Sequence, residues 1–224
     1  MSQVTYLGVI FSSLLGSLIY YYFQKPKYKN TQKLMMIILA FVFFLEAVGG
    51  YTASRSIKNV MLYNVCWIYI ESLLIVWYFS LLEKNPKVKR YFFIGFGAAC
   101  LWGLINSLTL QPINEEFQYL SLLPMGLLII GMAIRYYYSI IHLNIYPNTD
   151  LMRVPHIWIT VGITFFYLEA LTLFGYLYLF PTSTSELIFA WSKLNRIMAG
   201  IMYLSFGISF YSEVIFGLRK KYQA

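Results

Sequence analysis

The chain has 224 residues, of which 59% are hydrophobic, 20% are aromatic and only 12% are charged. A soluble globular domain usually carries about 25% charged residues, so this composition excludes an ordinary soluble enzyme or binding domain. The net charge of +8 does not indicate a nucleic-acid partner, because most Lys and Arg residues lie in short segments between apolar stretches, where they orient membrane helices.

Seven stretches of the sequence are long and apolar enough to cross a hydrocarbon layer about 30 Å thick, each as a helix of roughly 20 residues. In chain order they cover about 4–23, 34–53, 61–82, 91–109, 117–141, 156–180 and 187–217. The N-terminus lacks the basic start and the cleavage site of a signal peptide, so the first stretch is expected to remain as a helix. We therefore predict an all-α polytopic membrane protein with a single transmembrane domain surrounded by the lipid bilayer.

The basic residues concentrate in alternate connections and at the C-terminus. They are Lys25, Lys27, Lys29 and Lys33 in the first connection, Lys84, Lys87, Lys89 and Arg90 in the third, and Arg219, Lys220 and Lys221 at the end of the chain. Seven crossings place all three groups on one side, which the positive-inside rule assigns to the cytoplasm. We expect the N-terminus outside, the C-terminus inside, and a location in a bacterial cytoplasmic membrane.

The order of short motifs indicates an internal duplication. The segment FFLEA at 43–47 corresponds to FYLEA at 166–170, and tyrosines at 20–22 correspond to tyrosines at 136–138. The layout would be one repeat over about 4–82, a linker helix over about 91–109, and a second repeat over about 117–217. A single linker helix makes the two triplets parallel repeats about an axis along the membrane normal. The alternative is seven unrelated helices of similar composition.

This three-one-three plan resembles that of the SWEET and PQ-loop transporters. The resemblance covers the helix plan of the whole chain and no motif, because the sequence has no Pro-Gln pair and only Pro124 lies inside a predicted span. In length and in its richness in Lys, Tyr and Phe, the chain also looks like small seven-helix membrane proteins of Bacteroidota-type bacteria. That similarity implies no particular activity.

Three glutamates lie near the centres of apolar stretches: Glu46, Glu71 and Glu169. A rise of ~1.5 Å per residue places Glu46 and Glu169 about 18 Å, and Glu71 about 16 Å, from the cytoplasmic face. An ionisable group at the bilayer centre costs several kcal/mol and usually has a function. We therefore expect these carboxylates to bind a ligand, to handle a proton or to make a specific helix contact.

Two arrangements of the glutamates are consistent with the sequence. In the first, Glu46 and Glu169 form the pseudo-symmetric pair of a polar site between the triplets, and Glu71 is a third member. Neighbouring carboxylates do not both ionise easily, so such a site can exchange a proton or bind a cation. In the second, each glutamate is protonated and hydrogen-bonds a neighbouring helix as part of the packing.

Other polar residues cluster at the expected outer ends of helices. Lys193 and Arg196 either reach down into an outer vestibule, where they would attract an anionic group, or extend to the surface. Asn64 and Asn195 begin corresponding helices of the two repeats and are expected at the same outer level. Arg135, in the inner half of its helix, is expected to extend toward the inner surface.

The residues required by several membrane chemistries are missing. The two histidines, His142 and His156, lie at helix ends with only Asp150 between them, which does not suit a zinc site, a Ser-His catalytic pair or a bis-histidine haem. Lys193 is too near the outer end for a retinal site. We therefore expect no catalytic residues, no metal and no cofactor.

These observations favour a small permease or ion-coupled transporter that binds a small solute, a cation or a proton at the midplane carboxylates. The alternative is a seven-helix sensory or regulatory membrane subunit. Because the loops are too short to form a domain, such a subunit would act through a separate protein partner at the basic cytoplasmic face. A weaker third option is a structural subunit of a larger membrane complex.

Overall fold

The computed structural model describes residues 1–24, 26–180 and 185–218, and these fold into helices without strands. The elements are α1 (Gln3–Phe23), α2 (Lys29–Ser54), α3 (Val60–Tyr63), the π-helix η1 (Asn64–Glu71), α4 (Ser72–Leu82), α5 (Pro86–Thr109), α6 (Tyr119–His142), the 3₁₀ turn η2 (Leu151–Arg153), α7 (Pro155–Leu179) and α8 (Ser185–Leu218). Seven helices, with α3, η1 and α4 counted as one, are long and apolar enough to cross a membrane. The all-α class and the seven predicted spans are therefore confirmed, and the pattern is that of an integral membrane protein.

Helix boundaries follow local capping chemistry. The Ser2 side chain accepts the Thr5 N–H at the start of α1, and Asn85 similarly caps α5, which satisfies backbone donors that lack a helical partner. Pro86 and Pro155 occupy the first positions of α5 and α7, where a missing N–H costs nothing. Helices α2 and α5 begin at Lys29 and Pro86, before the apolar stretches that the sequence indicates, because each continues into the basic segment that precedes its apolar stretch.

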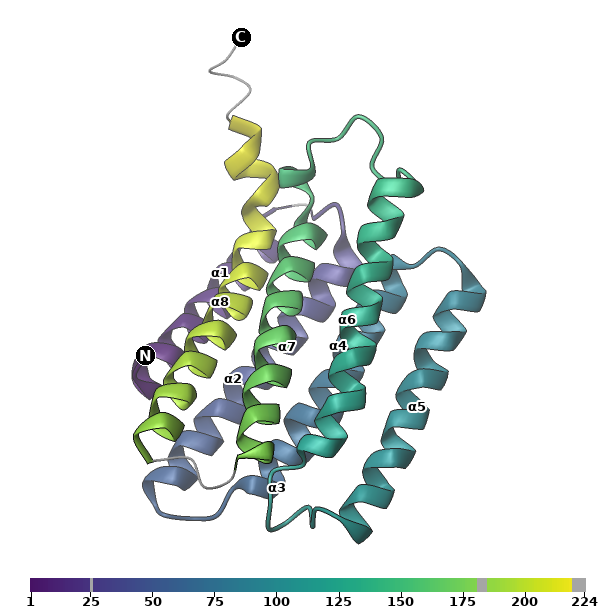
Figure 1. Ribbon diagram of the computed structural model, residues 1–224. Helices are drawn as coiled ribbons and strands as arrows, with labels where there is room; N and C mark the ends of the chain where they lie inside the picture. The colour runs from purple at the N-terminus through teal and green to yellow at the C-terminus, as the bar shows by residue number, and fades with distance from the viewer. Residues whose placement is uncertain (25, 181–184, 219–224) are drawn as a thin grey trace.

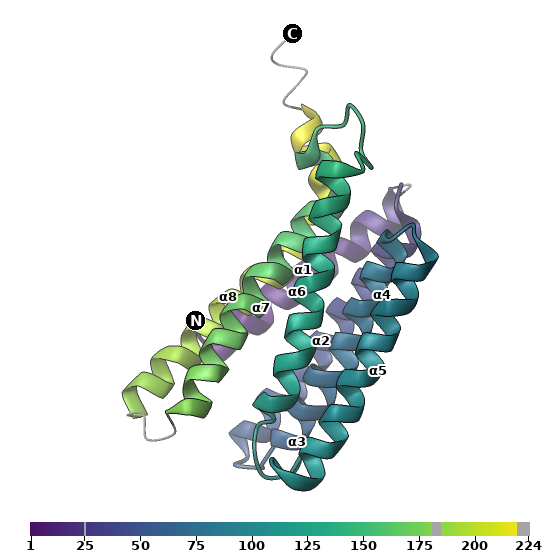
Figure 2. The same cartoon turned by 45° about the vertical axis from the view of Figure 1, so that its right-hand side comes forward.

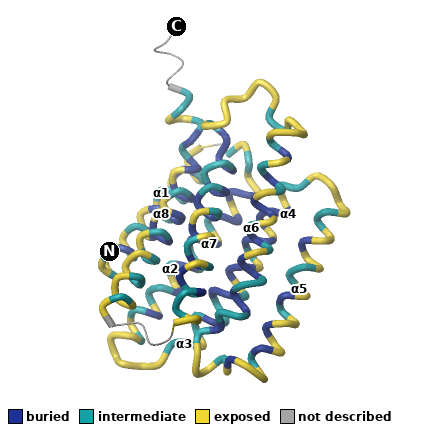
Figure 3. The backbone as a smooth tube through the Cα atoms, in the orientation of Figure 1, coloured by how far each residue is buried: buried dark blue, intermediate teal, exposed yellow. Residues whose placement is uncertain are grey.

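Six of the crossings form a closed ring. Helix α1 packs against α2 and α8, α7 against α8 and α6, and α4 against α6 and α2. In Figure 2, α7 and α8 lie on one side of the molecule, α4 and α5 on the other, and α6 lies between them. Helix α5 contacts α6 and α4 at the periphery and is mostly exposed or half-buried (Figure 3).

The connections between the helices alternate between the two ends of the ring. Figure 1 shows the α4–α5 and α6–α7 connections toward the end at which α8 finishes, and the α2–α3 and α5–α6 connections at the opposite end. Lys25, Pro181 and the basic C-terminal residues Arg219, Lys220 and Lys221 lie outside the described residues. The orientation in the membrane therefore stays a prediction.

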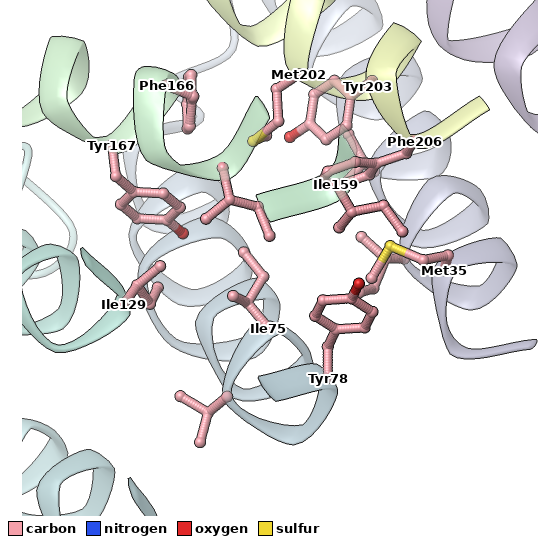
Figure 4. Close-up of a cluster of buried hydrophobic side chains, with 14 of the residues drawn as sticks. Met35, Ile75, Tyr78, Ile129, Ile159, Phe166, Tyr167, Met202, Tyr203 and Phe206 are labelled. Atoms are coloured by element: carbon pink, nitrogen blue, oxygen red, sulfur yellow. The ribbon is translucent and has the colours of Figure 1, made fainter. Parts of the chain in front are cut away.

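One half of the ring interior is a closed apolar core. Figure 4 shows side chains of α2, α4, α6, α7 and α8 that converge there, among them Ile75, Met202 and Phe206, all fully buried. The Tyr78 hydroxyl and His156 Nδ1 are 3.0 Å apart in this half, which pairs two buried polar groups, as burial requires. Fully buried side chains from five helices therefore fill this half of the ring among the described residues.

An ion pair joins the end of α4 to α6 near the α4–α5 connection. Arg135 Nε donates to Glu83 Oε2 at 2.8 Å, so Arg135 does extend toward the end of the ring, where it meets a carboxylate. Burial alone would raise the pKa of Glu83, but hydrogen bonds from Arg135 and from the Asn85 and Lys84 backbone hold that pKa below its usual value. Glu83 is therefore ionised at neutral pH and ties the α4–α5 connection to α6.

Candidate functional site

A cavity of about 490 Å³ occupies the other half of the ring, within the ~300–1,000 Å³ typical of small-molecule sites. Helices α1, α2, α7 and α8 and the segment α3–η1 all contribute to its wall. Its polar lining residues include Gln3, Glu46, Asn59, Glu71, Asn195 and Arg196. Its aromatic lining residues include Tyr6, Tyr63, Trp67, Phe117, Phe166 and Phe174.

The cavity has a mouth and a floor. Ala53, at the end of α2, is exposed, and Gln3, at the start of α1, is half-buried, so the mouth lies where α1 begins and α2 ends. Glu71 and Tyr203 are only 1% and 3% exposed, so they form the floor, next to the closed core. Because Glu71 lies equally far from the two ends of its crossing, Val60–Leu82, the floor is level with the middle of that crossing.

Glu46 is held on the α2 wall by two tyrosines from different helices. The Tyr6 hydroxyl of α1 donates to Oε1 at 3.3 Å, and the Tyr63 hydroxyl of α3 donates to Oε2 at 3.2 Å. Arg196 of α8 is near enough to interact electrostatically with the same carboxylate. Two helices thus hold one carboxylate, and a third places a cationic side chain in the same cavity.

Glu71 is the last residue of the π-helix η1. A π segment adds residues to a helical turn and so changes which side chains face the interior, and such segments are frequent at functional sites. The Tyr203 hydroxyl of α8 donates to Glu71 Oε1 at 2.9 Å, and this contact is buried. Glu46 interacts electrostatically with Glu71, so the structure brings these two predicted site residues together.

Glu169 lies elsewhere. It is half-buried on α7 and is absent from the described lining of the cavity. Both of its carboxylate oxygens are buried and have no hydrogen-bond partner among the described residues. The sequence predicts that Glu46 pairs with Glu169, but the structure places Glu46 and Glu71 on the same cavity. Helix α7 faces that cavity with Phe166 and Phe174 instead.

The four residues expected in an outer vestibule divide into two groups. Arg196 and Asn195 line the cavity. Lys193 is exposed and lies over the Phe189 ring at 4.2 Å, so it extends to the surface. Asn64 is fully buried and is part of the scaffold.

Asn64 fastens the α5–α6 connection to the third crossing. Its Nδ2 donates to the carbonyls of Ile113 and Glu116 at 2.9 and 2.7 Å, and its Oδ1 accepts the Gln118 N–H at 3.1 Å. These three bonds use both amide hydrogens and one lone pair of the oxygen, and Asn64 is not among the described lining residues of the cavity. Its effect on the site is to fix the start of η1.

Sequence reasoning missed the tyrosines that position the carboxylates. Tyr6 and Tyr63 lie near helix ends, where tyrosines are typical of interfacial belts, so their positions in the sequence do not indicate a role in the site. Tyr203 carried a usable signal, because it lies near the middle of a span, where a hydroxyl needs a buried acceptor. That acceptor is Glu71.

The arrangement can bind a small polar or cationic molecule between two carboxylates and a set of aromatic rings. No group of three or more His, Cys, Asp or Glu side chains within the described residues is placed to hold a metal ion. Comparison with protein-family models, curated proteins and solved structures gives no match. The functional argument therefore rests on the cavity itself.

Proposed function

We propose that the protein is a small integral-membrane permease or ion-coupled transporter whose solute binds between Glu46 and Glu71. The observation that carries the proposal is a cavity that reaches a midplane carboxylate from one end of the ring and stops at a closed core. Transport by alternating access needs such a site, open to one side at a time and located near the midplane.

The proposed orientation has the N-terminus outside and the C-terminus inside a bacterial cytoplasmic membrane. It is supported by the basic residues in alternate connections, following the positive-inside rule. In that orientation the cavity opens outward, because Gln3 at the start of α1 lies at its mouth. Solute would enter from outside and be released inward after the closed half opens.

The internal repeat is part of the same proposal. The matching segments at 43–47 and 166–170 support two parallel triplets with α5 as linker, a plan similar to that of SWEET and PQ-loop transporters. Rocking of one triplet against the other would open the closed half. The Arg135–Glu83 ion pair, which joins α6 to the end of α4, would then have to break or move with the triplets.

The second candidate is a sensory or regulatory subunit with the same ligand site. A cavity with one opening suits a receptor as well as one state of a transporter. The signal would pass to a separate protein at the basic face, since the described connections are short. This candidate predicts binding of a solute without its movement across the membrane.

Flux into proteoliposomes tests the proposal. The purified chain is reconstituted and screened with labelled amines, amino acids and sugars, with and without a pH gradient. Glu46→Gln should abolish uptake while the protein remains folded, because it removes a charged acceptor from the cavity wall. Glu169→Gln is the matched control, outside the cavity, and should retain uptake. Uptake by Glu46→Gln at the wild-type rate would refute the proposal.

A further inference from the structure

When both glutamates are ionised, the hydrogen-bonding capacity left at their carboxylates is acceptor capacity. The Tyr6 and Tyr63 hydroxyls donate to Glu46, and the Tyr203 hydroxyl donates to Glu71, so the hydrogens of all three are in use. A carboxylate offers about four acceptor sites, and both glutamates retain unused ones. The ligand group that pairs with these two carboxylates is therefore a donor. An ammonium group has three donors and no acceptor, whereas each hydroxyl of a sugar brings both.

The charges in the cavity leave one carboxylate without a cation. Arg196 is the basic side chain among the described lining residues. Its Nη2 donates to Ser192 Oγ at 3.3 Å, and it acts on Glu46 electrostatically from beyond ion-pair distance. The described electrostatic partners of Glu71 are all neutral or negative; they are Tyr6, Glu46, Tyr167 and Tyr203. Asn195 Oδ1, also at the cavity, is a further buried acceptor without a described partner. An ionised Glu71 therefore needs one positive charge from a ligand.

The wall beside Glu71 is aromatic. Trp67, one turn before Glu71 in η1, packs against Phe117, Phe166 and Phe174 with ring centroids 5.6, 5.9 and 5.5 Å apart. Aromatic faces attract cations and cover apolar surface. A Ca²⁺ or Mg²⁺ ion needs about six or more oxygen ligands, which this aromatic wall does not provide. The wall instead suits a cation that carries an apolar body.

We propose that the ligand is a monovalent organic ammonium ion with a ring-sized apolar body, bound to Glu71 in exchange for one proton. In the empty cavity the Glu71 carboxyl carries the proton. When the ammonium ion binds, the O–H bond of the carboxyl breaks and the proton leaves through the mouth. The ammonium keeps all its N–H bonds and forms an ion pair with the new carboxylate, so the total charge in the cavity is unchanged.

The groups that face Glu71 are compatible with this exchange. Tyr6 comes from α1, Glu46 from α2, Tyr167 from α7 and Tyr203 from α8, and each interacts with it electrostatically. The tyrosines are neutral and Glu46 is negative, so none of them replaces the missing cation. Arg196 lies with Glu46 toward the mouth. The inference deepens the proposed transport function, but ligand binding can be measured without transport.

Equilibrium binding of 2-phenylethylamine to the full chain in detergent tests the inference. The wild-type protein should bind it saturably and release one proton per ligand. In the pH range in which Glu71 of the ligand-free protein is protonated, the affinity should rise by up to about tenfold per pH unit. The neutral isostere 2-phenylethanol should bind at least about tenfold more weakly. Glu71→Gln should lose both the affinity and its pH dependence, and Glu169→Gln should keep both.

Several results would overturn the ligand class. Equal binding of 2-phenylethanol, the absence of proton release, or an unchanged pH dependence in Glu71→Gln would each do so. The first two need no variant, so a folding defect in Glu71→Gln does not weaken the test. Binding of the amine without flux in proteoliposomes would refute transport and keep the ligand class. Flux of a sugar without binding of the amine would refute the ligand class and keep transport.

Discussion

The substitution Gly207→Ala tests the close approach of the first and last crossings. A Cβ added at Gly207 of α8 would lie 2.9 Å from both the Cα and the Cβ of Ser13 in α1. Carbon atoms pack at about 3.5–4.0 Å, so α1 would have to move by roughly 0.6–1.1 Å. Because one of the blocking atoms belongs to the backbone, no change of rotamer relieves the clash.

The expected loss of stability follows from this clash. Overpacking of a close-packed site costs about 1–3 kcal/mol, while alanine in place of glycine within a helix contributes roughly 0.5–1 kcal/mol of stabilisation. Gly131→Ala is the matched control, since its added Cβ would meet nothing within 4 Å. Relative to that control, Gly207→Ala should be destabilised by about 1–3 kcal/mol, which lowers the melting temperature by roughly 2–12 °C.

Thermal unfolding of the two variants in one detergent measures the difference. The shift should be accompanied by weaker ligand binding, because the Tyr6 ring of α1 and the Tyr203 ring of α8, 6.4 Å apart, are positioned by the same helix pair. If Gly207→Ala melts at the same temperature as Gly131→Ala, α1 and α8 do not approach as closely as the fold requires.

Three further changes probe the scaffold. Asn64→Ala should cost about 1–3 kcal/mol, because it leaves the buried Gln118 N–H unpaired; an unchanged melting temperature would contradict this. Arg135 holds the pKa of Glu83 low, so the Arg135–Glu83 ion pair stabilises the folded state above the usual Glu pKa of about 4.3. That stabilisation is lost as the pH falls through the lowered pKa of Glu83. Glu83→Gln should therefore flatten the fall in melting temperature under acid, and an identical pH profile would be inconsistent with the ion pair. Lys193→Ala should change stability by less than about 0.5 kcal/mol and leave ligand binding intact, whereas a loss of binding would place Lys193 in the site.

The seven crossings could be predicted from the sequence because the bilayer imposes length and apolarity directly. The mid-span position of Glu46 and Glu71 was sufficient to identify them as site candidates, since charges there are costly. Which carboxylates share a cavity could not be predicted. When nearly every face of a helix is apolar, hydrophobic periodicity does not fix its rotation, and packing turned Glu169 away from Glu46.

The π-helix and the vestibule residues show a second limit of the sequence. Nothing in the residues 64–71 distinguishes a π-helix from an α-helix, yet this segment sets the direction of Glu71. Asn64 was expected at the vestibule because it begins a helix, but its amide bonds the α5–α6 connection instead. That partner lies about fifty residues away in the chain, so only the folded structure reveals it.

The most direct test of a ligand cavity that reaches the midplane is thiol labelling of Ala199→Cys, in a background where Cys66 and Cys100 are replaced by alanine. Ala199 is 4% exposed and lines the cavity between Arg196 and Tyr203, whereas Ala133 is fully buried in the closed core and is absent from the described lining. A membrane-impermeant reagent applied outside should label Ala199→Cys, excess 2-phenylethylamine should slow that labelling, and Ala133→Cys should stay unlabelled. Absence of labelling at position 199 from either side, or equal labelling at 199 and 133, would contradict the account.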